Sequence, residues 1–163
     1  VPFAVGIKTG APLGDPLTGS DGPILALALS PDGQTLVSGN ADGTVQRWSV
    51  KDGTAIGTPI AAHSTPVQAI NYPAGGQNII TGSSDGSLAL WNPDGTPAGR
   101  VEAAHQGGIT HITSSPDGQV LTTTGGDGTV RLWDRATLQP RGETIAAHGD
   151  SVSAVAYSPM AIP

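Results

Sequence analysis

Residues 125–134 read GGDGTVRLWD, and this stretch decides the fold because the chain repeats it. The earlier copies are NADGTVQRWS at residues 40–49 and SSDGSLALWN at residues 83–92. The Asp-Gly pair in each copy favours a tight hairpin, since both residues accept positive φ angles. Each copy therefore predicts a turn followed by a short strand that ends near a tryptophan.

Three kinds of residue recur along the chain with one period. The tryptophans, histidines and turn aspartates are spaced 42 or 43 residues apart: Trp48, Trp91 and Trp133; His63, His105 and His148; Asp42, Asp85 and Asp127. A fixed internal period of this length indicates an architecture of stacked structural repeats.

Four short strands are predicted in each repeat. The first two are apolar or alternating runs: residues 24–30, 67–72, 109–115 and 152–158 for the first strand, and residues 35–39, 78–82 and 120–125 for the second. The third strand leads to the tryptophan. A more polar fourth segment, interrupted by Pro and Gly, is typical of an exposed edge strand. The chain is therefore predicted to be all-β.

The order His, SPDG, SGxxDGTV and LWD resembles the WD40 repeat, whose units form the four-stranded blades of a β-propeller. The resemblance divides the chain into the end of a preceding blade, three full repeats and the innermost strand of a further repeat: residues 1–19, 20–62, 63–104, 105–147 and 148–163. It implies a partial or incomplete ring of about four blades. Counting across the two ends leaves the fourth blade about one strand short.

Composition limits the function. The chain has 163 residues, a net charge of -6 and no cysteine. An acidic surface disfavours nucleic-acid binding, and no apolar run is long enough to span a bilayer. We expect no cofactor and no metal; the compartment is left open, with the cytoplasm favoured.

The resemblance also implies a hydrogen-bonded tetrad of His, Ser/Thr, Asp and Trp in each blade. Two repeats have all four residues: His63, Thr81, Asp85 and Trp91, and His105, Thr123, Asp127 and Trp133. Two are incomplete: Ser38, Asp42 and Trp48, with Ser20 at the histidine position, and His148 alone.

Hydroxyl, imidazole and carboxylate are also the components of a nucleophilic triad. A catalytic hydroxyl has to be exposed beside an oxyanion hole, whereas this one would accept a hydrogen bond from the buried indole N–H. Several equivalent active sites in one chain would follow from the catalytic interpretation. We therefore predict a structural role and no catalytic residue.

Two other residues depart from the repeat. His111 stands where Ala26, Ala69 and Ala154 stand, and it is interpreted as a packed histidine rather than a metal ligand with His105 and Glu102. Arg47 stands in an apolar row directly before a tryptophan, which makes it a candidate contact with a partner; the alternative is an arginine that covers a looser blade.

The leading hypothesis for function is a non-enzymatic scaffold for protein–protein interaction, as part of a larger propeller or a multi-subunit assembly. WD40 proteins generally bind through the top face, whose positions here carry no Trp, Tyr or Arg, so blade edges are favoured for binding. One alternative is a regulatory domain of a signalling NTPase or kinase, because the linkers resemble those of bacterial WD40 arrays. Another is a half-propeller that forms a homodimer by strand exchange.

Overall fold

The computed structural model describes residue 17 and residues 22–75 and 78–158. Within these residues the chain forms twelve β-strands and no helix. The strands are β1 (Ile24–Leu29), β2 (Thr35–Asn40), β3 (Thr44–Ser49), β4 (Ala55–Ala61), β5 (Val67–Asn71), β6 (Ile79–Ser83), β7 (Leu88–Trp91), β8 (Pro97–Val101), β9 (Ile109–Ser114), β10 (Val120–Gly125), β11 (Thr129–Asp134) and β12 (Ile145–Ala146). No helix of the described part is long and apolar enough to cross a membrane.

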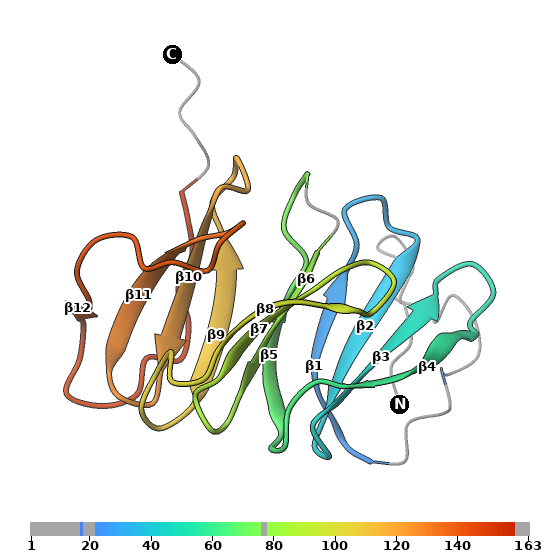
Figure 1. Ribbon diagram of the computed structural model, residues 1–163, viewed down its shortest axis with the longest axis horizontal. Coiled ribbons are helices and arrows are strands. Elements are labelled where there is room, and N and C mark those ends of the chain that lie inside the picture. The colour runs from blue at the N-terminus through green and yellow to red at the C-terminus, as the bar shows by residue number, and fades with distance from the viewer. Residues whose placement is uncertain (1–16, 18–21, 76–77, 159–163) are drawn as a thin grey trace, which may run out of the picture.

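The strands form three antiparallel sheets, each a simple meander of four consecutive strands. We call them blade one (β1–β4), blade two (β5–β8) and blade three (β9–β12). Figure 1 shows them side by side, with blade one in blue and cyan, blade two in green and blade three in orange. The three sheets do not close into a ring. The predicted all-β propeller fold, incomplete as a ring, is confirmed.

Apolar side chains hold neighbouring blades together. One buried cluster joins blades one and two and includes Val37, Val67 and Ile70; a second joins blades two and three and includes Ile80 and Ile112. Because burying a side chain of this size contributes about 1.5–3 kcal/mol, these clusters account for much of the stability.

Glycine allows the blades to approach closely. A Cβ atom added to Gly39 of β2 would lie 2.6 Å from Cγ1 of Val67, and one added to Gly82 of β6 would lie 2.6 Å from Cγ2 of Ile109. Real Cβ atoms do not approach other carbons so closely, so any side chain here would push the next blade away. The equivalent residue of blade three is Thr124, and that blade therefore meets its next segment differently.

Residues 152–158 differ from the predicted first strand of a further repeat, because the structure has no strand there. A strand requires ladder hydrogen bonds, and no described strand follows this segment to supply them. The segment nevertheless lies against blade three: the Val152 amide donates to the Gly125 carbonyl, and the Thr122 and Tyr157 hydroxyls are 2.5 Å apart. That a further repeat begins here stays a prediction. The predicted preceding blade, residues 1–19, lies outside the described residues except for residue 17.

Candidate functional site

In blade three, the four residues that the sequence groups together form a continuous hydrogen-bonded chain. The Trp133 indole donates to Oγ1 of Thr123 (2.8 Å), and this hydroxyl lies 2.7 Å from Nε2 of His105. Nδ1 of His105 lies 3.0 Å from Oδ1 of Asp127. Since a carboxylate can only accept, Nδ1 carries the proton, and the neutral ring accepts the threonine hydrogen at Nε2.

Turn geometry places Asp127 at the end of this chain. Its carboxylate accepts hydrogen bonds from the Gln106 amide and from the Thr129 amide and hydroxyl. Burial raises the pKa of Asp127, but the hydrogen bonds from Thr129 and His105 outweigh it and hold the pKa well below the usual range. Burial lowers the pKa of His105, while Asp127 opposes that change. Near pH 7, therefore, Asp127 is an ionised carboxylate and the His105 ring beside it is neutral.

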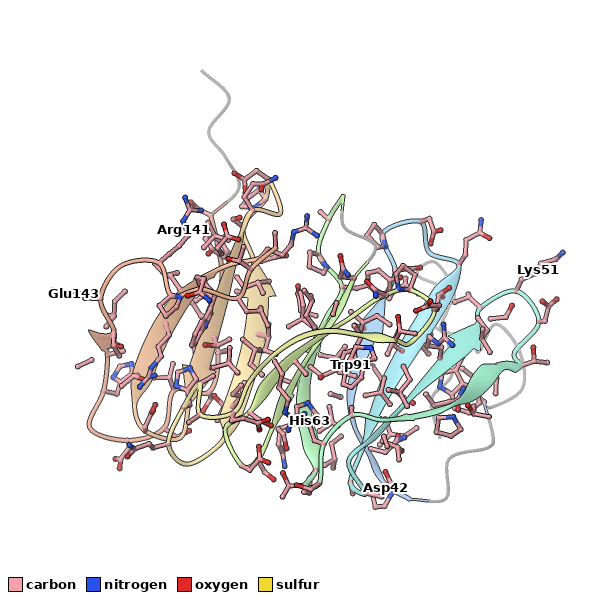
Figure 2. The ribbon with its side chains drawn as sticks, viewed as in Figure 1. Asp42, Lys51, His63, Trp91, Arg141 and Glu143 are labelled. Carbon is pink, nitrogen blue, oxygen red and sulfur yellow. The ribbon has the colours of Figure 1, made fainter. Side chains whose placement is uncertain are left out.

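Blade two uses the same residue types with a different connection. The Trp91 indole donates to Thr81 (2.9 Å), and Thr81 lies 2.8 Å from Nε2 of His63. Nδ1 of His63, however, lies 2.7 Å from the hydroxyl of Ser87. Oδ1 of Asp85 accepts a hydrogen bond from the backbone amide of Ser87 (2.8 Å), so Ser87 stands between imidazole and carboxylate. Figure 2 shows His63 and Trp91 within the central part of the molecule.

An arginine from the edge strand completes the blade-two network. Arg100 of β8 donates to the Ser87 hydroxyl (3.3 Å) and to the Ala62 carbonyl (2.9 Å). Burial, and then the positive charge of Arg100, lower the pKa of His63 to about 4. His63 is therefore neutral at pH 7.

The two incomplete sets are simpler. In blade one the Trp48 indole donates to the Ser38 hydroxyl (3.0 Å), and the exposed Asp42 accepts hydrogen bonds from the amide and hydroxyl of Thr44. Ser20 lies outside the described residues. His148 is exposed, and its backbone amide donates to the Gly128 carbonyl.

The networks are buried, which decides what they can do chemically. Thr81 and Thr123 are fully buried, and each hydroxyl already accepts from an indole and contacts an imidazole. A nucleophile needs access to a substrate and a lone pair free to attack. The arrangement therefore suits a cross-strand clamp and leaves no hydroxyl free for catalysis within it.

Arg47 has a partner inside this chain. Its guanidinium donates to the Pro93 carbonyl in the β7–β8 turn of blade two. The side chain thus spans from blade one to the neighbouring blade. A contact with a separate subunit stays a prediction.

His111 is half-buried on β9, opposite Thr124 of β10 in the sheet register. Among the described residues, no group of three or more His, Cys, Asp or Glu is placed to hold a metal ion.

The edge of the blades that carries the histidine loops bears a shallow depression. Its volume is about 330 Å³, and its lining residues come from all three of blade two, blade three and the following segment: Gln68, Ser84, Gly107, Gly108, Ile109, Thr110 and Ser153. Five of these, Gln68, Ser84, Gly108, Thr110 and Ser153, occupy positions that the WD40 resemblance assigns to the top face. The depression offers amide, hydroxyl and backbone groups and no charge.

Sequence reasoning missed Ser87, Thr129 and Arg100. The first two stand two residues after the turn aspartate, where a hydroxyl can bind that carboxylate, so the pattern Asp-Gly-Ser/Thr carried a usable signal. Arg100 lies on an irregular edge strand, and its reach toward Ser87 depends on the register between β7 and β8.

Comparison with known proteins gives a family. The family model described as WD40, "WD domain, G-beta repeat", matches residues 11–49, 53–92 and 98–134. Among curated proteins, no significant sequence match was found.

Solved structures share the fold. The computationally designed Ika4 protein is 27% identical with a TM-score of 0.77, over 90% of this chain and 89% of that one. The designed Ika8 protein is 28% identical with a TM-score of 0.80, over 96% of this chain and 46% of that one. The RRP9 WD40 repeats, 22% identical with a TM-score of 0.77 over 83% of this chain and 42% of that one, show likeness of fold alone.

Proposed function

Because this chain belongs to the WD40-repeat family, whose domains generally mediate protein–protein interaction, we propose that it is a non-enzymatic scaffold within a larger propeller or multi-subunit assembly. The family is generally non-catalytic. The proposal concerns what this chain's own surface offers to a partner.

The contrast between buried and accessible polar groups carries the proposal. The hydroxyl–imidazole pairs Thr81–His63 and Thr123–His105 are buried and mutually bonded. Breaking either pair would leave a buried polar group without a partner, at a cost of about 1–3 kcal/mol. Reactive side chains are therefore committed to stability, and binding is left to the surface.

The depression lined by Gln68, Ser84 and Thr110 is the surface best suited to a partner. Its polar groups are uncharged donors and acceptors, which match the backbone amides and carbonyls of a protein loop. The rigid blades below hold these groups in place, so little entropy is lost when a partner binds. This differs from the blade edges that the sequence favours, and the experiment compares the two.

A photo-crosslinking residue tests this proposal. It would replace Gln68 in the depression or, as a matched control, the exposed Thr58 of edge strand β4. We expect discrete protein adducts in an extract of the producing cells from position 68 but not from position 58, lost when Ser84→Arg is added. Adducts from position 58 alone would move binding to the edge, and none from either position would overturn the scaffold.

A self-associating half-propeller is a second candidate, favoured by exposed leucines on β1. Regulation of a linked signalling NTPase or kinase stays a prediction.

A further inference from the structure

The same position of the innermost strand has very different exposure in the three blades. Ile70 of β5 is 9% exposed and Ile112 of β9 is 3% exposed, whereas Leu27 of β1 is 48% exposed. Leu25 and Leu29, on the same side of β1, are 43% and 52% exposed. Blade one therefore presents a row of three exposed leucines, whereas blades two and three bury the residue equivalent to the central one, Leu27.

The chain itself shows what kind of surface covers such a row. Ile70 belongs to the cluster against which Ala26 and Ala28 of the preceding innermost strand pack, and its Cδ1 would lie 2.9 Å from a Cβ added to Gly39. The cluster around Ile112 likewise contains Ala69, from the innermost strand of blade two. The cover is thus an innermost strand that presents small residues.

One such small-residue surface is uncovered within the described part of the chain. Residues 152–158 alternate: Val155 and Tyr157 are partly buried, while Ala154 and Ala156 are exposed. By the 42–43-residue period, Ala154 and Ala156 correspond to Ala26 and Ala28. They therefore point away from blade three as Ala26 and Ala28 point from blade one toward blade two.

Both surfaces are exposed in the described part of the chain, and both are uncharged. Neither residues 24–30 nor residues 151–158 include a charged side chain. The leucines lie on blade one and the alanines on the segment that lies against blade three, so the two surfaces stand at opposite ends of the row of three blades and do not meet within the chain (Figure 1). In a pair of chains, the leucine row of one copy can meet the alanine surface of the other.

We propose that the Leu25–Leu27–Leu29 face of β1 docks on the Ala154–Ala156 face of a second copy. In a two-fold pair the contact forms twice, because each copy supplies one leucine face and one alanine face. Each contact repeats the packing seen between blades one and two. This inference rests on the proposed scaffold function and names one partner for it.

Two variants and a mixture test the pairing. Light scattering of the full chain is expected to give twice the mass of one chain. Leu27→Asp places an uncompensated charge in the contact, and Ala154→Arg adds bulk there, so each variant alone is expected to weaken association by at least about tenfold. Val50→Asp, at an apolar residue 40% exposed elsewhere, is the matched control and leaves the mass unchanged.

Mixing Leu27→Asp with Ala154→Arg is the decisive step. In the mixed pair both substitutions meet in one contact, as an acid facing a base, and the second contact is unaltered. We expect the mixture to recover the double mass, while circular dichroism shows that each variant remains folded.

Two results would overturn the pairing. A wild-type mass of one chain with an intact β signal would assign the leucine face to another segment or another protein. A double mass that neither variant reduces would place the dimer contact elsewhere. Neither result affects the crosslinks expected at Gln68, so the scaffold proposal can stand or fail separately.

Discussion

Blades two and three contain the same four residue types at the same spacing and connect them differently. In blade three, Asp127 contacts the imidazole of His105 directly, 3.0 Å away. In blade two, Ser87 lies between His63 and Asp85, and Arg100 donates to the same serine. The shared motif therefore determines which strands are joined, but it does not determine whether the aspartate contacts the imidazole directly or through a serine.

The difference has an electrostatic consequence. The carboxylate beside His105 favours a charged ring and partly offsets the effect of burial on its pKa. Burial, and then the charge of Arg100, lower the pKa of His63 to about 4, and the hydrogen-bond partner of its Nδ1 is a serine rather than a carboxylate. The two histidines should thus respond differently to acid and to mutation.

The largest effect is expected where the two blades agree, at the threonine that joins tryptophan to histidine. Thr123→Val keeps the shape but leaves both the Trp133 indole and a buried histidine nitrogen unpaired, which should lower the free energy of unfolding by roughly 2–5 kcal/mol. Urea unfolding followed by tryptophan fluorescence measures it. The matched variant Ser38→Ala in blade one removes the acceptor of the Trp48 indole and a long bond (3.5 Å) to the Gln46 carbonyl but frees no histidine nitrogen, so it should cost less. Equal losses would mean that the histidine bond contributes nothing.

Acid should destabilise blade two through His63. The folded-state pKa of about 4 lies below the ordinary histidine value of about 6.5, so between these pH values the unfolded chain binds a proton that the folded chain does not. Stability is then complete above about pH 6.5 and falls as the pH drops to about 4, by on the order of 3 kcal/mol at most. Thermal unfolding across this range, with the His63 ring followed by NMR, checks the window.

The variant Arg100→Gln tests how much the arginine charge contributes to the low pKa of His63. Removing the positive charge near His63 should raise the pKa of that histidine, while Arg131→Gln, near His105, serves as the matched control and should leave His63 unchanged. An unchanged pKa of His63 in Arg100→Gln would assign its whole depression to burial.

Much of this architecture follows from the sequence because repetition supplies the same information three times. The period identifies the strands, the Asp-Gly turns and the residues Thr123 and Trp133. Ser87 was missed because the resemblance supplies four positions only, and the equivalent residues Ser87 and Thr129 differ in how they contact the imidazole. The partner of Arg47 was missed because Pro93 is 46 residues away, and no local pattern encodes a contact between blades.

Replacing the turn aspartates should lower the free energy of unfolding by less, and by different amounts in blades two and three. Asp127→Asn removes the charge that faces His105 and puts an amide N–H₂ where an oxygen accepted a hydrogen bond, so a loss of roughly 1–3 kcal/mol is expected. Asp85→Asn should cost less, because Asp85 is exposed and reaches His63 only through Ser87. Urea unfolding of both variants at pH 7 compares them. A larger loss of unfolding free energy for Asp85→Asn would contradict the idea that direct contact with the imidazole makes Asp127 the more important carboxylate.

The smallest effect should come from blade one, whose described residues include no histidine for the aspartate to reach. Asp42 is exposed, and a single oxygen, Oδ1, accepts both the amide (2.9 Å) and the hydroxyl (2.7 Å) of Thr44. An asparagine carbonyl can still accept both bonds, and the lost charge lies at an exposed site, so Asp42→Asn should change the free energy of unfolding by less than about 0.5 kcal/mol. The same measurement as for Asp127→Asn applies. If Asp42→Asn proved as costly as Asp127→Asn, the carboxylate would contribute to stability mainly through the turn. A negligible cost would show that its contribution in blade three comes from contact with the imidazole.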